Sequence, residues 1–363
     1  MKYACISSDS HVIEPPTLWK DYCPPAFRDR APKLERLPES DRYVCEGREM
    51  MRVGAISAAG KKKETVTHNG FWERDVPKGA YEPRARVEAM HVDGVDAEVV
   101  YPTISLRVYG FNDTPLQRAC FDAYNAWASD FCKGAPQQLR AIGLVNMDDI
   151  EEGVAQVQRV AKLGLAGAMI SIKPSQGNEY SQKQYDPFWA AAQDAGLPVS
   201  LHIGTDRAAN AAKYGSVGEL VLVAAPVQVA IADIAFGGVF QRFPKLQVIS
   251  AENDVGWVAH YLEHLDYIFY KRSGINKWEL KGDKPASAWV REQAFFTFTD
   301  DHCWIPGRSV TGVERFMWAS DYPHNMSSWP NSQPLIKEIF AEMPQAERHA
   351  VIAGNAAKLY GFN

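Results

Sequence analysis

The sequence is poor in the features that mark secreted, membrane-bound and nucleic-acid-binding proteins. Six cysteines are spread over 363 residues, and no Cys-x-x-Cys pair occurs. This scatter argues against a disulfide-stabilised scaffold and favours a reducing compartment. The N-terminal stretch lacks the unbroken apolar core of a signal peptide, and no run approaches the roughly 18 apolar residues of a membrane span. We therefore expect a soluble cytoplasmic protein without a membrane partner.

Charge is nearly balanced along the chain. The 39 basic and 44 acidic side chains leave a formal net charge of −5, and the longest basic run covers only residues 61–63. Such a distribution lacks the basic patch with which proteins bind nucleic acid. Hydrophobic residues make up 46% and charged residues 23% of the chain, which is typical of a globular protein. Composition therefore excludes the disordered, collagen-like and coiled-coil classes.

Short apolar runs alternate with longer segments of helical period, a pattern typical of parallel βα units. We count eight such runs, which cover residues 3–8, 97–101, 141–145, 167–172, 198–203, 246–251, 294–298 and 315–320. Most of them are followed by helical segments, for example 116–131, 150–162, 186–195 and 255–270. Eight strands connected in this way close into a (β/α)₈ TIM barrel. We predict a single α/β domain over residues 1–363.

One long segment departs from this repeat. Between residues 15 and 80 the composition shifts to Pro, Gly and mixed charge. We interpret 15–80 as an insertion after the first strand that lies over the barrel mouth, with hairpin turns at 61–64 and 68–70. The tail has helical period at 335–341 and 346–359, so we expect it to complete the outer ring of helices.

Metal-ligand side chains gather where the predicted strands end, which is the active face of such a barrel. The first strand leads into Asp9 and His11, the fifth ends at His202, and the eighth reaches Asp321. Asp9 and His11 are two residues apart and therefore point to the same face of a strand. Imidazole and carboxylate are common ligands of Zn²⁺ and Mn²⁺. The four residues predict one divalent metal ion, with Zn²⁺ favoured and Mn²⁺ as the alternative.

Several ordered motifs resemble the amidohydrolase superfamily, in the branch around aminocarboxymuconate-semialdehyde decarboxylase. They are 8–15 (SDSHVIEP), 236–246 (FGGVFQRFPKL), 317–324 (MWASDYPH) and 354–357 (GNAA). The resemblance implies a barrel enzyme whose single divalent ion is held by Asp9, His11, His202 and Asp321. It also implies a homodimer that acts on a small-molecule carboxylic acid.

Two positions depart from the pattern of that family. Relatives usually have His or Glu as the first ligand, where this chain has Asp9. The related decarboxylases usually place a catalytic His on the sixth strand, where this chain has Glu252. A carboxylate there can exchange a proton if burial near the ion adjusts its pKa. The alternatives are an additional ligand, or a structural carboxylate satisfied by backbone amides or an arginine.

The favoured activity is metal-dependent, non-oxidative decarboxylation of a small unsaturated or aromatic carboxylic acid. Asp321 or Glu252 would deliver a proton as carbon dioxide leaves, with the substrate carboxylate bound to the ion. The alternative is hydrolysis of an amide, ester, lactone or C–C bond at the same residues. His324 is a further candidate for catalysis because it follows Asp321 by three residues. Trp19 and His302 are candidates for substrate binding.

A second histidine motif offers a rival site. Residues 260–264 contain His, Glu and His in the His-x-x-Glu-His pattern of inverted zinc metallopeptidases. An apolar stripe that includes Trp257, Leu262 and Leu265 predicts that this helix packs on the outside of the barrel. Because outer helices lie far from the strand ends, we favour the strand-end site.

Overall fold

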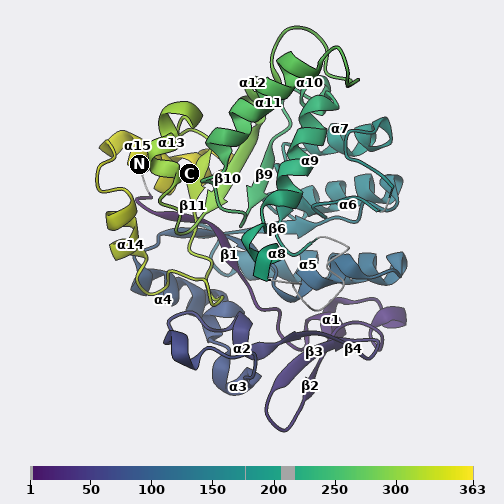
Figure 1. Ribbon diagram of the computed structural model, residues 1–363. Coiled ribbons are helices and arrows are strands. Elements are labelled where there is room, and N and C mark those ends of the chain that lie inside the picture. The colour runs from purple at the N-terminus through teal and green to yellow at the C-terminus, as the bar shows by residue number, and fades with distance from the viewer. Residues whose placement is uncertain (1–2, 176, 206–216, 363) are drawn as a thin grey trace.

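The computed structural model describes residues 3–175, 177–205 and 217–362. Eight parallel strands form one sheet in the order β1-β5-β6-β7-β8-β9-β10-β11, and helices surround it (Figure 1). The strands are β1 (Ile6–His11), β5 (Ala97–Tyr101), β6 (Leu139–Leu144), β7 (Gly167–Ile170), β8 (Val199–His202), β9 (Val248–Ala251), β10 (Ala294–Phe298) and β11 (Phe316–Trp318). Each predicted apolar run overlaps one of them, so the predicted (β/α)₈ barrel is confirmed.

Burial on both faces explains why most of these strands, although not β1 (ISSDSH), are mainly apolar. Every residue of the eight strands is buried except Arg140 in β6. Parallel strands covered by helices outside and by other strands inside need apolar side chains on both faces. At the seam between β1 and β11, Ser7 Oγ accepts a hydrogen bond of 2.8 Å from the Ser320 N–H. The Asp321 N–H then donates to the Asp9 carbonyl at 3.0 Å, which brings two predicted metal ligands together.

Helices cover the outside of the barrel. The longest, α5 (Thr114–Lys133), begins at Asp113, whose side chain accepts a hydrogen bond of 2.9 Å from the Leu116 N–H. The other long helices are α4 (Pro83–Asp93), α6 (Ile150–Lys162), α7 (Asp186–Asp194), α9 (Ala225–Phe236), α11 (Val258–Arg272), α12 (Ala286–Gln293), α13 (Trp304–Thr311) and α14 (Ser332–Ile339). None of the described helices combines the length and apolar character that a membrane crossing requires.

Shorter helical segments lie between these elements and at the end of the chain. The α-helices are α1 (Leu18–Tyr22), α2 (Val53–Ile56), α3 (Trp72–Asp75), α8 (Val217–Val221), α10 (Val239–Arg242), α15 (Gln345–His349) and α16 (Asn355–Tyr360). The 3₁₀ segments are η1 (Pro25–Phe27), η2 (Lys63–Thr65), η3 (Lys78–Ala80), η4 (Ile104–Gly110) and η5 (Lys183–Tyr185). A π-helical turn, η7 (Ala350–Gly354), joins α15 to α16, so the predicted tail helix 346–359 is one irregular helical run.

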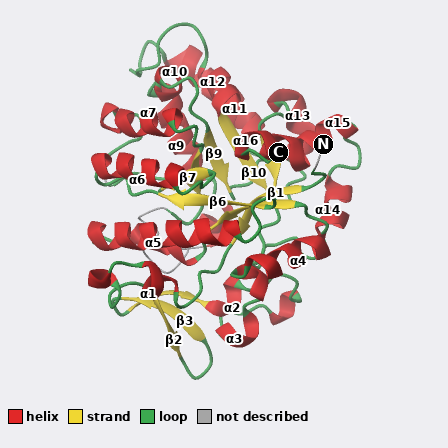
Figure 2. Ribbon diagram, turned by 180° about the vertical axis from the view of Figure 1, so that it is seen from behind, coloured by secondary structure: helices red, strands yellow, loops and turns green. Residues whose placement is uncertain are grey.

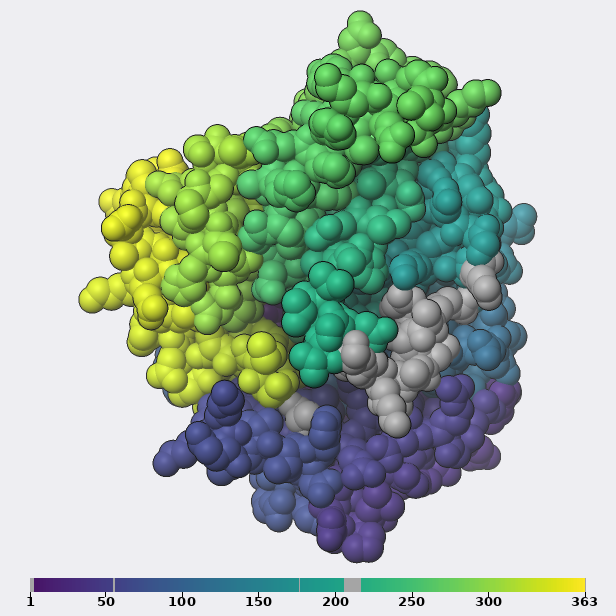
Figure 3. All heavy atoms as spheres, viewed as in Figure 1, coloured from purple at the N-terminus to yellow at the C-terminus, as the bar shows by residue number. Residues whose placement is uncertain are grey.

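Between β1 and β5 the chain forms a separate antiparallel sheet. Its strands are β2 (Lys33–Arg36), β3 (Asp41–Cys45) and β4 (Arg48–Arg52). Figure 2 shows this sheet at one end of the molecule, and the same N-terminal part is purple in Figure 3. The predicted hairpin turns at 61–64 and 68–70 are wrong, because no described strand lies between β4 and β5 and Lys63–Thr65 forms the 3₁₀ segment η2. The hairpin of this sheet, β3–β4, turns instead at Glu46 and Gly47. Both have positive φ, 47° and 77°, as a two-residue turn between twisted strands requires.

Candidate metal centre at the strand ends

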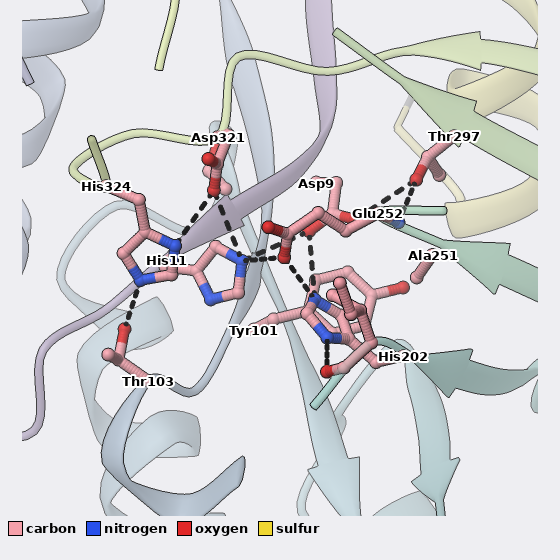
Figure 4. A network of polar contacts seen from close by, with 12 residues as sticks. Asp9, His11, Tyr101, Thr103, His202, Ala251, Glu252, Thr297, Asp321 and His324 are labelled. Atoms are coloured by element: carbon pink, nitrogen blue, oxygen red, sulfur yellow. Dashed lines mark hydrogen bonds and ion pairs between the residues drawn. The ribbon is translucent and has the colours of Figure 1, made fainter. Parts of the chain in front are cut away.

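Five acidic and histidine side chains converge at the C-terminal ends of four strands (Figure 4). Asp9 and His11 lie on β1, His202 ends β8, and Glu252 and Asp321 follow β9 and β11. His11 Nε2 lies 3.6 Å from Asp9 Oδ1 and 3.6 Å from Asp321 Oδ1. His202 Nε2 lies 3.6 Å from the same Asp9 oxygen and 3.3 Å from Glu252 Oε2. The structure thus brings the four residues predicted as ligands, and Glu252, into one cluster of close pairs.

Backbone carbonyls orient both imidazoles. His11 Nδ1 donates to the Pro102 carbonyl at 2.8 Å, and His202 Nδ1 donates to the Ile203 carbonyl at 2.8 Å. Because a carbonyl oxygen can only accept, each neutral ring carries its hydrogen on Nδ1 and turns the Nε2 lone pair toward the centre. Burial and the neighbouring His324 lower the pKa of His11 well below its usual range. That imidazole is therefore neutral and able to bind a metal.

The atoms that face the centre have no hydrogen-bond partner among the described residues. They are Asp9 Oδ1, His11 Nε2, His202 Nε2, and Asp321 Oδ1 and Oδ2. Two overlapping groups offer ligand atoms within 4.8 Å of one another: Asp9, His11 and His202, and His11, Glu252, Asp321 and His324. Buried polar atoms are normally paired. Imidazole nitrogens and carboxylate oxygens at this spacing therefore fit a divalent transition metal.

Negative charge dominates the centre when no cation is bound. Burial and the nearby Asp9 carboxylate raise the pKa of Asp321 well above its usual range. Removal from bulk water, together with Asp321, raises the pKa of Glu252 to about 8. Burial opposes protonation of His202, but Asp9 outweighs it and raises the pKa of that ring to about 9. All three pKa shifts favour the protonated forms of these side chains, as expected of a site that binds a positive charge.

Two of the carboxylates project from strained turns. The φ angle is 56° at Glu252 and 54° at Asp321, in the left-handed region that residues other than Gly rarely adopt. Thr297 Oγ1 holds the first turn, because it accepts from the Glu252 N–H at 2.9 Å and donates to Asp9 Oδ2 at 3.1 Å. Strain of about 1–3 kcal/mol per residue persists only where neighbours enforce it, and it is common at functional sites.

His324 contacts the same centre from the loop after β11. Its Nδ1 lies 3.0 Å from Asp321 Oδ1, and its Nε2 shares a hydrogen bond of 2.9 Å with Thr103 Oγ1. The ring lies over that of His11, with centroids 4.0 Å apart. Burial lowers the pKa of His324, so the ring is neutral near pH 7 and can exchange a proton with either neighbour.

Sequence reasoning missed the residue that fixes Thr103. Glu14 is fully buried, and its carboxylate accepts from the backbone N–H groups of Thr103, Ile104 and Ser105 at 2.8 to 3.2 Å. These bonds tie the start of η4 to the chain just beyond β1. The available signal was a charged residue in an apolar stretch, since a buried carboxylate requires partners.

A buried arginine joins the two ends of the barrel seam. Arg86 donates to the carbonyls of His11 at 2.7 Å and Tyr322 at 3.5 Å, and it forms an ion pair with Glu98. Its guanidinium group also lies over the Tyr322 ring, 4.7 Å from the centroid. Both carbonyls belong to the segments that carry predicted ligands. An arginine on a helix is usually exposed, so the sequence contains no signal for this role.

The two residues predicted to bind substrate have different surroundings. Trp19 is fully buried, and its ring packs edge to face against Tyr43 with centroids 6.3 Å apart. His302 is exposed, and its Nε2 lies 3.2 Å from Asp300 Oδ1. In the part of the chain that the structure describes, neither belongs to a metal-capable group. Their role in substrate binding stays a prediction.

A cavity of about 290 Å³ lies between the insertion and the barrel. Its walls come from the β3–β4 hairpin, from η4 and the loop that follows it, and from Gly204. Gly204 is two residues beyond His202, and η4 begins next to Thr103, which contacts His324. The cavity therefore lies beside two segments that adjoin the centre, although none of the five side chains of the centre lines it.

Comparison with known proteins identifies the family of the chain. A family model described as amidohydrolase matches residues 66–362. The decarboxylase orsB of Emericella nidulans is 26% identical over 261 residues, which cover 66% of this chain and 73% of that protein. The 2-amino-3-carboxymuconate-6-semialdehyde decarboxylase of Dictyostelium discoideum is 22% identical over 313 residues, which cover 83% of this chain and 82% of that protein.

A solved structure shares the fold over nearly the whole length. It is the 5-carboxyvanillate decarboxylase of Novosphingobium aromaticivorans, complexed with manganese and 4-hydroxy-3-methoxy-5-nitrobenzoic acid. The TM-score is 0.71 at 18% identity, with 99% of this chain and 96% of that chain covered. Since the family match extends from within the insertion to the last helix, the chain belongs to the amidohydrolase family, as its motifs predicted.

Proposed function

We propose that this protein is a metal-dependent, non-oxidative decarboxylase of a small aromatic or unsaturated carboxylic acid. The observation that carries the proposal is the buried cluster of carboxylates and imidazoles at the strand ends. Its inward-facing atoms lack hydrogen-bond partners in the described part of the chain. Further support comes from the two curated relatives, which are decarboxylases by name, and from the similar structure, which is a complex with manganese and a nitrobenzoic acid.

Asp9, His11, His202 and Asp321 would hold the ion. Two carboxylates and two imidazoles suit either Zn²⁺ or Mn²⁺. When bound, the ion supplies positive charge that attracts the substrate carboxylate and stabilises the negative charge that develops during the reaction. Arg86 keeps the segments that carry these side chains in register, because it donates to the His11 carbonyl at 2.7 Å.

Glu252 is the acid to which we assign the proton transfer. Its side chain is 29% exposed, whereas those of His11 and His202 are fully buried, so a substrate can reach it. Without a bound cation, burial and Asp321 raise its pKa to about 8, so the group can take up and release a proton near neutral pH. The proton passes to the substrate carbon that carries the carboxylate, the C–C bond breaks, and its electron pair stays on that carbon as carbon dioxide leaves. Solvent then returns a proton to Glu252.

His324 positions Asp321 for this reaction. It contacts Asp321 through Nδ1 and Thr103 through Nε2, so its ring is held from both sides. We assign two roles to His324: it orients the Asp321 carboxylate, and it offers a path for protons between Asp321 and Thr103. Because Glu14 fixes the backbone of Thr103, the chain just beyond β1 supports this contact.

The segment 15–80 would form one wall of the substrate site. The cavity of about 290 Å³ has the β3–β4 hairpin on one side and η4 on the other. This volume is at the lower limit of small-molecule sites, which are about 300–1,000 Å³, and it suits a compact acid. In this proposal the insertion covers the barrel mouth and selects the substrate by size.

A panel of candidate acids tests the proposal. Hydroxybenzoates, muconate-like acids, and a set of amides, esters and lactones are incubated with the metal-loaded wild type and with His202→Ala. Carbon dioxide, the decarboxylated product and any hydrolysis product are measured. We expect the wild type to release one carbon dioxide for each product molecule and the variant to release almost none. Turnover confined to amides, esters or lactones would favour the hydrolase alternative and contradict the proposal.

The expected oligomeric state and the expected cellular compartment stay predictions. The resemblance implies a homodimer, and the composition indicates the cytoplasm. Sedimentation equilibrium of the purified protein measures the first, and fractionation of source cells measures the second.

A further inference from the structure

Helix α11 carries two histidines on one exposed face. His260 and His264 lie one turn apart, on a helix of the outer ring that packs beside α12 and α13 (Figure 1). Their rings are nearly parallel, with an interplanar angle of 24° and centroids 5.6 Å apart. Tyr267 stacks on His264 at 5.7 Å and 11°, which limits the orientations of that ring. All three side chains are exposed.

This pair is separate from the centre at the strand ends. His11 and His202 are fully buried inside the barrel, whereas His260 and His264 face solvent. Among the described residues, groups of three or more metal-capable side chains occur only at the strand ends. A metallopeptidase site needs three protein ligands and a bound water, and the pair does not supply them. The motif therefore calls for an explanation other than peptidase activity.

We propose that His260 and His264 form a surface site for one divalent ion of the Cu²⁺, Ni²⁺ or Zn²⁺ class. Two imidazoles that bind an ion at about 2.0 Å, at an angle of about 90–110°, have ring centroids about 4.5–5.2 Å apart. The observed separation is 5.6 Å, so the two exposed side chains must turn toward each other before both can bind one ion. Imidazole suits these ions, whereas Mg²⁺ and Ca²⁺ prefer oxygen ligands.

Because both rings lie on one helix, they should bind one ion together as a chelating pair. Once one ring binds an ion, the second ring is held nearby, so the pair should bind at least about 10²-fold more tightly than a single exposed histidine. Glu263 is exposed beside His264 and adds negative charge close to the ion. Because both nitrogens reach one ion only when this turn is helical, binding should also stabilise α11.

Retention on a resin that carries Cu²⁺ tests the site. An immobilised ion can reach surface imidazoles but not the buried His11 and His202, so the result is independent of the strand-end centre. Untagged wild type, H260Q and H264Q are eluted with an imidazole gradient. H91Q is the matched control, because His91 is exposed on helix α4 without a histidine one turn away. We expect H260Q and H264Q to elute early, and H91Q to elute with the wild type.

Titration with Ni²⁺ in solution measures the affinity directly. The variant H260Q/H264Q should bind one ion fewer than the wild type, and each single variant should bind that ion at least about 10²-fold more weakly. Both positions are exposed, and circular dichroism checks that the variants are folded. Elution of H260Q and H264Q together with the wild type, or an equal shift in H91Q, would overturn the proposal.

Discussion

Replacing Glu252 by Gln should remove most of the turnover while the fold and the bound ion remain. Gln keeps the volume and hydrogen-bonding capacity of Glu, but it cannot exchange a proton. The Glu252 carboxylate lies 3.3 Å from His202 Nε2 and 3.4 Å from His11 Nε2. It is therefore within reach of a substrate bound at the same point.

The size of the effect follows from the role of a positioned acid. General acid–base catalysis contributes about 10²- to 10⁴-fold to the rate, and a 10²-fold loss corresponds to about 2.7 kcal/mol of transition-state stabilisation. Because Asp9, His11, His202 and Asp321 would hold the ion without Glu252, the variant should keep close to one ion per chain. The loss should fall on kcat rather than KM, since proton transfer stabilises the transition state.

Two assays test this prediction. One measures carbon dioxide release at saturating substrate, and the other measures metal content by plasma mass spectrometry. Asp254→Asn is the matched control, because Asp254 also follows β9 at positive φ, 51°, but is exposed. D254N should retain wild-type turnover. Near-normal turnover of E252Q would make Glu252 structural and leave Asp321 as the only proton carrier. Loss of the ion from E252Q would instead make Glu252 a ligand.

Three further predictions concern stability and metal binding. Arg86→Met should destabilise the fold by about 3–5 kcal/mol, because it leaves the buried Glu98 uncompensated. Glu98→Gln in the same chain should restore part of this loss in denaturant titrations, and no recovery would refute the reasoning. Burial and Glu179 raise the pKa of Asp233 to about 6, so the folded state holds that proton more tightly and loses stability as pH rises from about 4 through about 6. Asp233→Asn should therefore be more stable than the wild type by on the order of 1 kcal/mol at pH 7.5, after allowance for solvent screening, and equally stable at pH 3.5. Thermal unfolding of both proteins at the two pH values measures this, and the same stability difference at both pH values would contradict it. His202→Ala should lose most of its bound ion, and a fully loaded variant would disprove the ligand assignment.

The barrel could be predicted because its strands are buried on both faces and are therefore continuously apolar. The first strand shows the limit of this signal. The prediction placed it at 3–8, whereas β1 covers Ile6–His11. Every residue of β1 after Ile6 is polar, because Ser10 shares hydrogen bonds with Ser7 and Ser320 at the seam, and because Asp9 and His11 face the centre.

The residue types at the strand ends could be predicted, but their supporting contacts could not. Thr103 and His324 are 221 positions apart in the sequence, and only the closed barrel brings them together. Glu14 and Arg86 act through backbone groups of distant segments, which leaves no local pattern. The β3–β4 hairpin was missed for a local reason: its first turn residue is Glu46, and Glu is not among the residues usual at positive φ.

The most direct test of the central claim is a metal titration of carbon dioxide release. The protein is stripped of ions with a chelator and then receives Mn²⁺ in steps, while turnover of an acid identified in the panel is measured. We predict that the stripped protein is inactive and that turnover rises in proportion to bound Mn²⁺ until about one ion per chain. Turnover that survives complete removal of metal would contradict a catalytic ion at Asp9, His11, His202 and Asp321.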